Sequence, residues 1–210
     1  MFLTYIVPLS ILLPILFGLL YYQNSTPGSK LLFYYLIASG SINLTAILLV
    51  ANGVKNNLPL LHLYTIVEAV FILSYLRTLF LNNLTQKILL IITILFPILC
   101  IINFTFIQSI FTFNTYTRPL EAILITFFCL LFLYQSGFTE NWLKKPSSWF
   151  NVGILIYFPV VCIIFIVSNY IVFVAKDKNL NTLIWEFHGA MSLLMYVFWA
   201  KGFSLIKQNG

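Results

Sequence analysis

The stretch SWFNVGILIYFPVVCIIFIVSNYIVFV, residues 148–174, contains no charged side chain and is almost entirely aliphatic or aromatic. A helix that crosses a bilayer needs about 20 mostly apolar residues, so this stretch alone predicts a transmembrane helix. The composition of the chain agrees, because 61% of its 210 residues are hydrophobic and only 8% are charged. Soluble domains carry about 25% charged residues, so the composition excludes a soluble protein.

Further segments of the same character predict an all-α, polytopic membrane protein: a single bundle of seven transmembrane helices with no soluble domain. The predicted spans are residues 2–22, 31–52, 60–82, 86–108, 117–136, 148–174 and 181–203. Pro8 and Pro14 interrupt the first span. We expect it to be a retained helix, because it lacks the basic start and the cleavage site of a secretory signal. Residues 103–117 fit either a helix or an interfacial loop.

The basic residues predict the orientation of the bundle. The connections on one side of the predicted bundle, with the C-terminal end, carry Lys30, Arg77, Lys87, Lys144, Lys145, Lys201 and Lys207. The connections on the other side carry Lys55, Arg118, Lys176 and Lys178. Basic residues accumulate on the cytoplasmic side of membranes, so we predict a cytoplasmic C-terminus and an N-terminus outside. The basic residues are scattered, so we expect them to contact lipid headgroups and not nucleic acid.

Ionisable side chains inside the predicted spans indicate a candidate site. A charged side chain at the centre of a span costs about 2.5–3.5 kcal/mol, so each needs a structural or functional reason. Counted from the helix ends at about 1.5 Å per residue, these side chains fall in one layer, in the half of the bundle nearer the N-terminus. We therefore predict a polar cavity that opens on that side. The candidate ligand-binding residues are Glu68, Glu121, Glu186, His188, His62, Arg118, Asn43, Asn169 and Tyr64.

Glu68 is the deepest acid in this layer, about 13 Å from the start of its helix at 1.5 Å per residue. Tyr64 and Thr65 precede it by one turn, so their hydroxyls can meet its carboxylate. Arg118 and Glu121 are spaced i,i+3, which predicts an ion pair at the mouth of the cavity. The alternative for this pair is a purely structural role that fixes its helix at the interface.

The last predicted helix carries two more ionisable candidates. Trp185, His188 and Ser192 share one face of it, whereas Glu186 lies about 200° around the helix from His188, so the two cannot both enter a narrow site unaided. His62 has an alternative as an interfacial residue, and Asn43 and Asn169 have alternatives as helix-packing hydrogen bonds.

Several stretches together resemble a family of small bacterial seven-helix inner-membrane proteins of uncharacterised activity. They are NLPLLHLYTIVE (57–68), FNTYTRPLE (113–121), FN (150–151), LIYF (155–158), SNY (168–170) and WEFH (185–188). The resemblance covers nearly the whole chain and implies the same topology, the same polar residues and a location in the bacterial cytoplasmic membrane. It also implies a membrane signalling partner, such as a sensor kinase.

Three functions follow as expectations. The first is a sensor or accessory subunit that binds a small ligand or ion in the outer half of the bundle, with Glu68 at its centre. The second is a small proton-coupled transporter in which Glu68 carries the proton. The third is a membrane-embedded hydrolase with zinc bound by His62, His188 and Glu68. We expect the protein to bind a ligand and not to catalyse a reaction. We predict no cofactor, with zinc as the weaker alternative.

Overall fold

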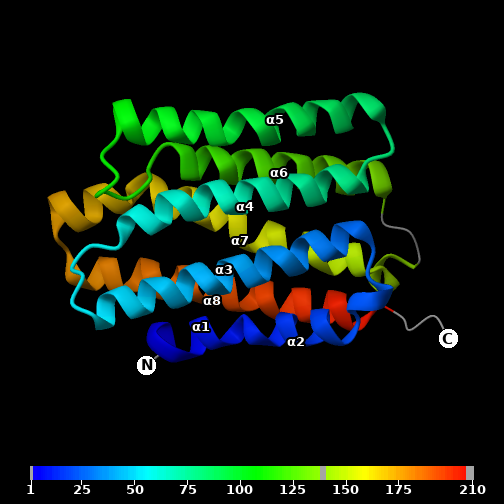
Figure 1. The fold of residues 1–210 in the computed structure, drawn as a ribbon, viewed down its shortest axis with the longest axis horizontal. Helices are drawn as coiled ribbons and strands as arrows, with labels where there is room; N and C mark the ends of the chain where they lie inside the picture. The colour runs from blue at the N-terminus through cyan, green and yellow to red at the C-terminus, as the bar shows by residue number, and fades with distance from the viewer. Residues whose placement is uncertain (1, 138–140, 207–210) are drawn as a thin grey trace.

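The computed structural model describes residues 2–137 and 141–206, and these form a bundle of helices without a β-strand (Figure 1). Six helices are long and apolar enough to cross a membrane, two of them extended by a π-helical turn. They are α3 (Pro27–Ala51), α4 (Leu58–Leu79), α5 (Asn83–Ile102) with η3 (Asn103–Ile107), α6 (Thr117–Ser136), α7 (Pro146–Asn169) with η5 (Tyr170–Ala175), and α8 (Lys178–Ser204). The predicted all-helical fold is confirmed.

The N-terminal segment differs from the predicted continuous span over residues 2–22. It is divided into η1 (Phe2–Ile6), α1 (Val7–Ser10), α2 (Leu12–Leu20) and the short η2 (Tyr22–Asn24). The break at Ile11 has a local cause: Pro14 cannot donate the i→i−4 hydrogen bond, and its ring crowds the preceding turn. The apolar helix Val7–Leu20 is shorter than the other six, so the seventh span stays a prediction.

Residues 103–117, for which the sequence fits either a helix or an interfacial loop, form some of each. Helical structure continues to Ile107, and residues 108–116 then form a loop that leads into α6 at Thr117. Asn169 of α7 holds this loop: its Oδ1 accepts from the Phe113 N–H at 2.9 Å and its Nδ2 donates to the Phe113 carbonyl at 3.0 Å. Asn169 therefore has a structural role at this end of the bundle.

Contacts between neighbouring helices close a ring in the order α2, α3, α4, α6, α7, α8 and back to α2, with α5 packed outside against α4. Figure 1 shows α5 along one edge and α1–α2 along the opposite edge. Loops 52–57, 108–116 and 176–177 lie at the end of the bundle that holds the N-terminus. This end is called the N-terminal end below.

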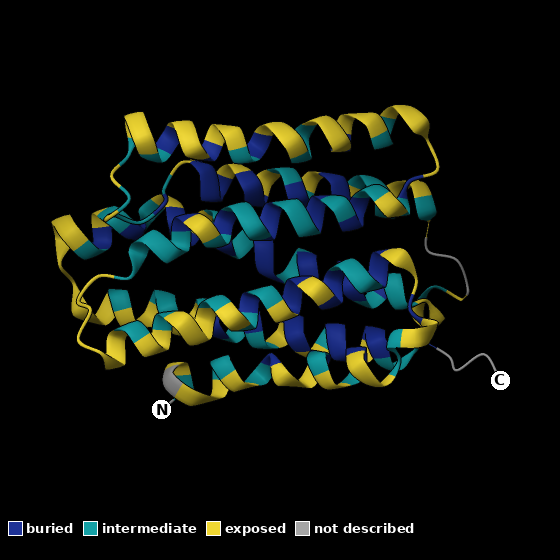
Figure 2. Cartoon of the chain, viewed as in Figure 1, coloured by how far each residue is buried: buried dark blue, intermediate teal, exposed yellow. Residues whose placement is uncertain are grey.

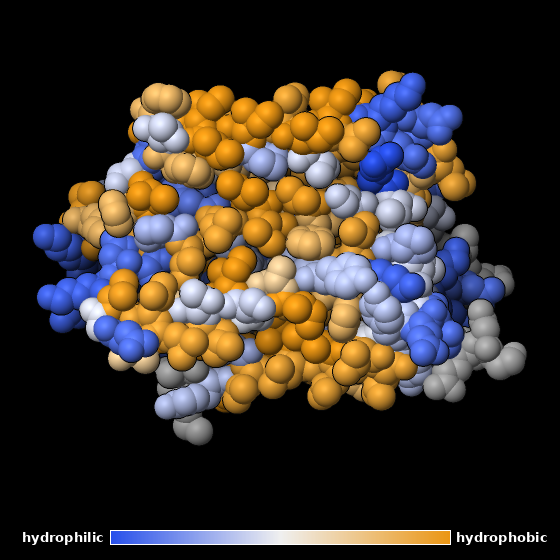
Figure 3. All heavy atoms as spheres, in the orientation of Figure 1, coloured by the Kyte–Doolittle hydropathy of each residue, from blue (hydrophilic) through white to orange (hydrophobic). Residues whose placement is uncertain are grey.

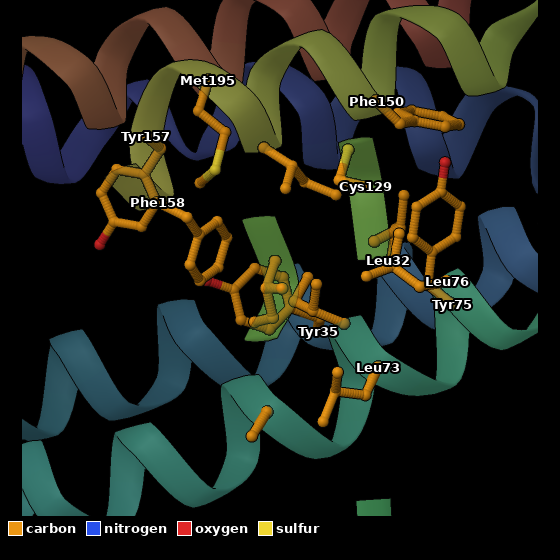
Figure 4. Close-up of a cluster of buried hydrophobic side chains, with 14 of the residues drawn as sticks. Leu32, Tyr35, Leu73, Tyr75, Leu76, Cys129, Phe150, Tyr157, Phe158 and Met195 are labelled. Carbon is orange, nitrogen blue, oxygen red and sulfur yellow. The ribbon is translucent and has the colours of Figure 1, made fainter. Parts of the chain in front are cut away.

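Helices α7 and α8 pack closely against each other at the other end. Gly153 faces the Trp199 indole, and Gly202 faces the Phe150 ring, so closely that a Cβ on either glycine would lie under 3.0 Å from them. The Trp199 indole N–H donates to the Phe150 carbonyl at 3.0 Å. Phe150 and Tyr75 belong to a buried cluster that Figure 4 shows extending to Tyr157. Small residues let membrane helices approach in this way.

The outer surface of the bundle is apolar between its two ends. Exposed residues follow the outward faces of the helices (Figure 2), and a broad hydrophobic band separates hydrophilic ends (Figure 3). Many large apolar side chains of the long helices are exposed, such as Leu95 of α5, Phe127 of α6 and Ile163 of α7. Together with the six long apolar helices, this surface is that of a multi-pass membrane protein.

Candidate functional site

The candidate site is built around Arg118, which lies in the first turn of α6 and is only 1% exposed. Its helix begins inside the protein: Thr117 at its start is buried, and so is Asn114 of the preceding 108–116 loop. Asn114 caps this buried start: its Oδ1 accepts from the Thr117 N–H at 3.1 Å and the Thr117 hydroxyl at 2.7 Å. A buried helix terminus needs such a partner for its free N–H groups.

Arg118 binds two buried carboxylates through one nitrogen. Its Nη1 donates to Oε2 of Glu68 on α4 and, at 2.6 Å, to Oε2 of Glu121 on α6. The predicted i,i+3 pair with Glu121 is therefore present. Its predicted position at the mouth is wrong, because the start of α6 is covered and Arg118 points into the bundle. The guanidinium also lies over the Tyr64 and Phe165 rings, at 5.3 and 5.6 Å from their centroids.

The second oxygen of Glu68 is held by tyrosines. Tyr35 of α3 and Tyr64 of α4 both donate to Glu68 Oε1, the latter at 3.0 Å, and the two hydroxyl oxygens lie 2.6 Å apart. Tyr64 thus meets Glu68 as the i,i+4 spacing predicts. Thr65 does not: its hydroxyl donates to the Leu61 carbonyl and accepts from Asn114.

A second chain of hydrogen bonds leads from Arg118 to α8. Nη2 of Arg118 donates to the Tyr157 hydroxyl of α7 at 3.2 Å, and this hydroxyl lies 3.2 Å from His188 Nε2. Ser192 donates to the His188 carbonyl, and the Trp185 ring packs against the imidazole with centroids 5.6 Å apart. The predicted common face of Trp185, His188 and Ser192 is confirmed.

Two atoms of this Arg118 cluster lack partners among the described residues. They are Nε of Arg118 and Oε1 of Glu121, both fully buried. With both acids ionised, the cluster holds two negative charges against one positive charge. Native proteins leave few buried polar atoms unpaired, so each of these two atoms can take one further hydrogen-bond partner.

A cavity of about 490 Å³ reaches the Arg118 cluster from the N-terminal end. Arg118, Tyr64, Tyr157 and His188 line its polar part. The rest of the wall is mostly apolar. One side comes from the N-terminal segment, α3 and α4, and includes Leu3, Val7, Ile11, Ile42, Ala46 and Leu61. The other side comes from the 108–116 loop, α7 and α8. The carboxylates of Glu68 and Glu121 are not in the lining, so Arg118 stands between them and the cavity.

Other predicted residues lie apart from the cluster. Glu186 is exposed on the outer face of α8, so its proposed place in the cavity is corrected; the 200° offset from His188 is the reason. His62 is buried, and its Nε2 lies 3.1 Å from the Thr112 carbonyl of the loop. Asn43 is exposed but lies at the cavity wall.

Within residues 2–137 and 141–206, no three histidine, cysteine or acidic side chains form a metal-binding group.

Tyr35 and Tyr157 are the site residues that sequence reasoning missed. Counting from the helix start places Tyr157 in the opposite half of the bundle from the cluster. However, α7 with η5 runs from Pro146 to Ala175, so Tyr157 falls near its middle. The predicted span 148–174 has nearly the same middle, so only the contacts of Tyr157 with Arg118 and His188 on other helices reveal its role. Tyr35 carries no local signal, because its partner Glu68 is on another helix.

Comparisons with protein-family models, with curated proteins and with solved structures find no match to this chain.

Proposed function

We propose that this protein binds a small organic ligand in the cavity above the Arg118 cluster and acts as a membrane sensor or accessory subunit. One observation carries the proposal: a cavity of about 490 Å³ ends on a buried, charged and incompletely paired cluster. Ligand sites in proteins have volumes of roughly 300–1,000 Å³ and combine apolar walls with a few convergent polar groups. The cavity has both features.

The charges of the cluster support a role beyond helix packing. Inserting charged side chains into a membrane costs about 2.5–3.5 kcal/mol each on insertion scales. Neutral hydrogen bonds such as the one from Trp199 to the Phe150 carbonyl already join helices in this bundle. A charged cluster is therefore an expensive way to achieve packing, and its contact with a cavity favours ligand binding.

The hydrogen bonds offer a route by which an occupied cavity changes the bundle. Side chains of α3, α4, α6, α7 and α8 meet within a few bonds of Arg118. A ligand that binds His188 or Tyr64 competes with these bonds and shifts the balance between helix arrangements. A membrane signalling protein such as a sensor kinase is the partner that we propose to receive this change.

The orientation of the bundle bears on where the ligand comes from. Arg118 is buried, so the connections at the N-terminal end keep only Lys55, Lys176 and Lys178 as basic residues. The two ends of the bundle therefore differ more in their number of basic residues, and this difference predicts that the N-terminal end lies outside the cell. We propose a bacterial cytoplasmic membrane location with the cavity on its outer side.

The test compares two alanine positions on α3. Ala46 lines the cavity, whereas Ala51 is exposed near the end of the same helix. The wild type, Ala46→Phe and Ala51→Phe are extracted gently from their own membrane and examined by native mass spectrometry. We expect a bound non-lipid molecule in the wild type and in Ala51→Phe, and its loss in Ala46→Phe. Identical spectra for all three proteins would contradict ligand binding in this cavity.

Proton-coupled transport is a second candidate, favoured by the unpaired Oε1 of Glu121. Both oxygens of Glu68 are engaged by tyrosines and Arg118. The proton would therefore bind Glu121, and not Glu68 as the sequence suggested. Protonated Glu121 would balance the charge of the cluster. Two carboxylates that share one cation cannot both stay ionised cheaply in an apolar medium.

A further inference from the structure

We propose that the cavity binds a neutral, planar carbonyl compound with an apolar chain, of the lipid-soluble quinone type, through a hydrogen bond from His188 Nδ1. This inference rests on the proposed ligand-binding function and names the chemistry of its ligand. Four features of the cavity support it: the direction of its hydrogen bonds, its charge, its aromatic walls and its apolar side.

The direction of the hydrogen bonds follows from Arg118. A guanidinium can only donate, so the Tyr157 hydroxyl accepts from Arg118 Nη2. Among the described residues the other partner of this hydroxyl is His188 Nε2, 3.2 Å away, so we assign the hydroxyl proton to that contact. Nε2 accepts, so a neutral imidazole carries its own proton on Nδ1. Within the described residues Nδ1 has no hydrogen-bond partner, and the free group of His188 at the cavity is a donor.

The charges near the cavity disfavour ionic ligands of both signs. A cationic head would meet Arg118, which is the charged residue in the lining. An anionic head would have to compete with Glu68 and Glu121 for a guanidinium that both carboxylates already engage. Charges interact strongly in such apolar surroundings. A neutral acceptor, such as a carbonyl oxygen, satisfies the His188 donor without either cost.

The shape of the ligand follows from the walls. Phe113 and Trp185 stack with centroids 5.3 Å apart and planes 29° apart, and Phe165 packs edge-on against Trp185. All three line the cavity, as do Tyr157 and Tyr196. Aromatic side chains favour flat ring systems by offset stacking, so the head of the ligand is planar.

The apolar side of the cavity accommodates a chain. Leu3 and Val7 of the N-terminal segment pack on Gly189 of α8, directly beside His188. With Ile11, Ile42 and Ala46 they form an apolar part of the wall, with Asn43 as a polar residue of the same α3 segment. A hydrocarbon chain gains about 25 cal/mol per Å² of buried apolar surface there.

The experiment uses full-length protein in lipid nanodiscs and a set of isotopically labelled probes with one ring and one chain. The probes are 2-decyl-1,4-benzoquinone, 4-decylbenzoate and 4-decylbenzylammonium, and binding to empty nanodiscs is subtracted. We expect the quinone to bind at least about tenfold more tightly than either ion, the equivalent of about one buried hydrogen bond. Equal affinity for the three heads, or preference for an ion, would overturn the ligand class while leaving ligand binding intact.

Two substitutions of His188 separate its two nitrogens. The amide of His188→Asn reaches the position of Nδ1 and keeps a donor toward the cavity. The amide of His188→Gln reaches the position of Nε2 and keeps only the contact with Tyr157. We expect quinone affinity to fall about tenfold in His188→Gln and about threefold or less in His188→Asn. Thermal unfolding of both variants checks that they fold.

The outcomes separate the two proposals. If His188→Gln binds the quinone as the wild type does, the His188 contact is wrong. If no probe binds above the empty nanodiscs and Ala46→Phe changes nothing in the native mass spectra, ligand binding in the cavity fails as well.

Discussion

Two groups of buried polar side chains in this bundle, one around Asn151 and one around Arg118, differ in their charge and in their hydrogen bonds. Around Asn151, the amide donates to the Ser147 carbonyl at 2.8 Å and to the Tyr75 hydroxyl at 3.4 Å, and it accepts from Cys129 at 3.1 Å. This group is neutral, and the close α7–α8 packing lies beside it. The Arg118 cluster is charged, leaves buried atoms unpaired and adjoins a cavity.

The difference separates polar side chains that hold helices together from polar side chains that serve a function. Neutral, saturated hydrogen bonds join membrane helices at little cost. Charges that lack a full set of partners persist in an apolar medium only where something else requires them. The three predictions that follow test this contrast, and unfolding in mixed micelles with increasing dodecyl sulfate measures each free energy.

The largest effect is expected for Arg118→Met. It leaves two buried carboxylates without a counter-charge, so we expect a loss of about 3–5 kcal/mol in the free energy of unfolding. The control Lys55→Met removes a positive charge from an exposed loop and should change little. Adding Glu68→Gln and Glu121→Gln to Arg118→Met should restore much of the loss. An Arg118→Met protein as stable as the Lys55→Met control would show that the cluster is not held by charge.

A smaller effect separates the two acids. Glu68 accepts from Tyr35, Tyr64 and Arg118, so Glu68→Gln should cost about 1.5–3 kcal/mol, the value of hydrogen bonds to a charged group. Glu121→Gln leaves one guanidinium balanced by one carboxylate.

We therefore expect the unfolding free energy of Glu121→Gln to stay within about 1 kcal/mol of the wild type. Equal losses in the two variants would contradict the different roles. Proton uptake by loaded liposomes tests transport with the same variants: it requires Glu121, so Glu121→Gln abolishes it if the second candidate is correct.

The smallest effect concerns the closely packed group. A Cβ at Gly153 would lie 2.7 Å from the Trp199 ring and 3.2 Å from the Met195 carbonyl. Gly153→Ala should therefore cost about 1–3 kcal/mol through overpacking. At Gly40 the nearest atom would be 3.9 Å away, so Gly40→Ala should be neutral or gain up to about 1 kcal/mol. Neither variant should alter ligand binding, and a binding defect in Gly153→Ala would mean that the two regions are coupled.

The candidate site could be predicted only in part from the sequence. Glu68, Glu121 and His188 were found because ionisable residues are conspicuous in apolar helices, and the pairing of Tyr64 with Glu68 follows from helix periodicity. Tyr35 and Tyr157 were not found, because tyrosines are common in these helices and only a partner on another helix distinguishes them. Glu186 was included for its depth, although its direction around α8 takes it to the outer face.

The sequence by itself determined the class of the protein and the approximate position of its six long helices. Apolar runs long enough to cross a bilayer must satisfy their backbone hydrogen bonds internally, which leaves helices as the only structure for segments of this kind. The start of α6 at Thr117 agrees to the residue with the predicted boundary.

Only the tertiary structure decided that Arg118 lies inside the bundle. Depth counted along a chain assumes that each helix starts at the surface, whereas the first residues of α6, Thr117 and Arg118, are buried. The bridge from Arg118 to Glu68 joins residues far apart in the sequence. Helix periodicity fixes which residues share a face of one helix, but the packing of separate helices decides which faces meet.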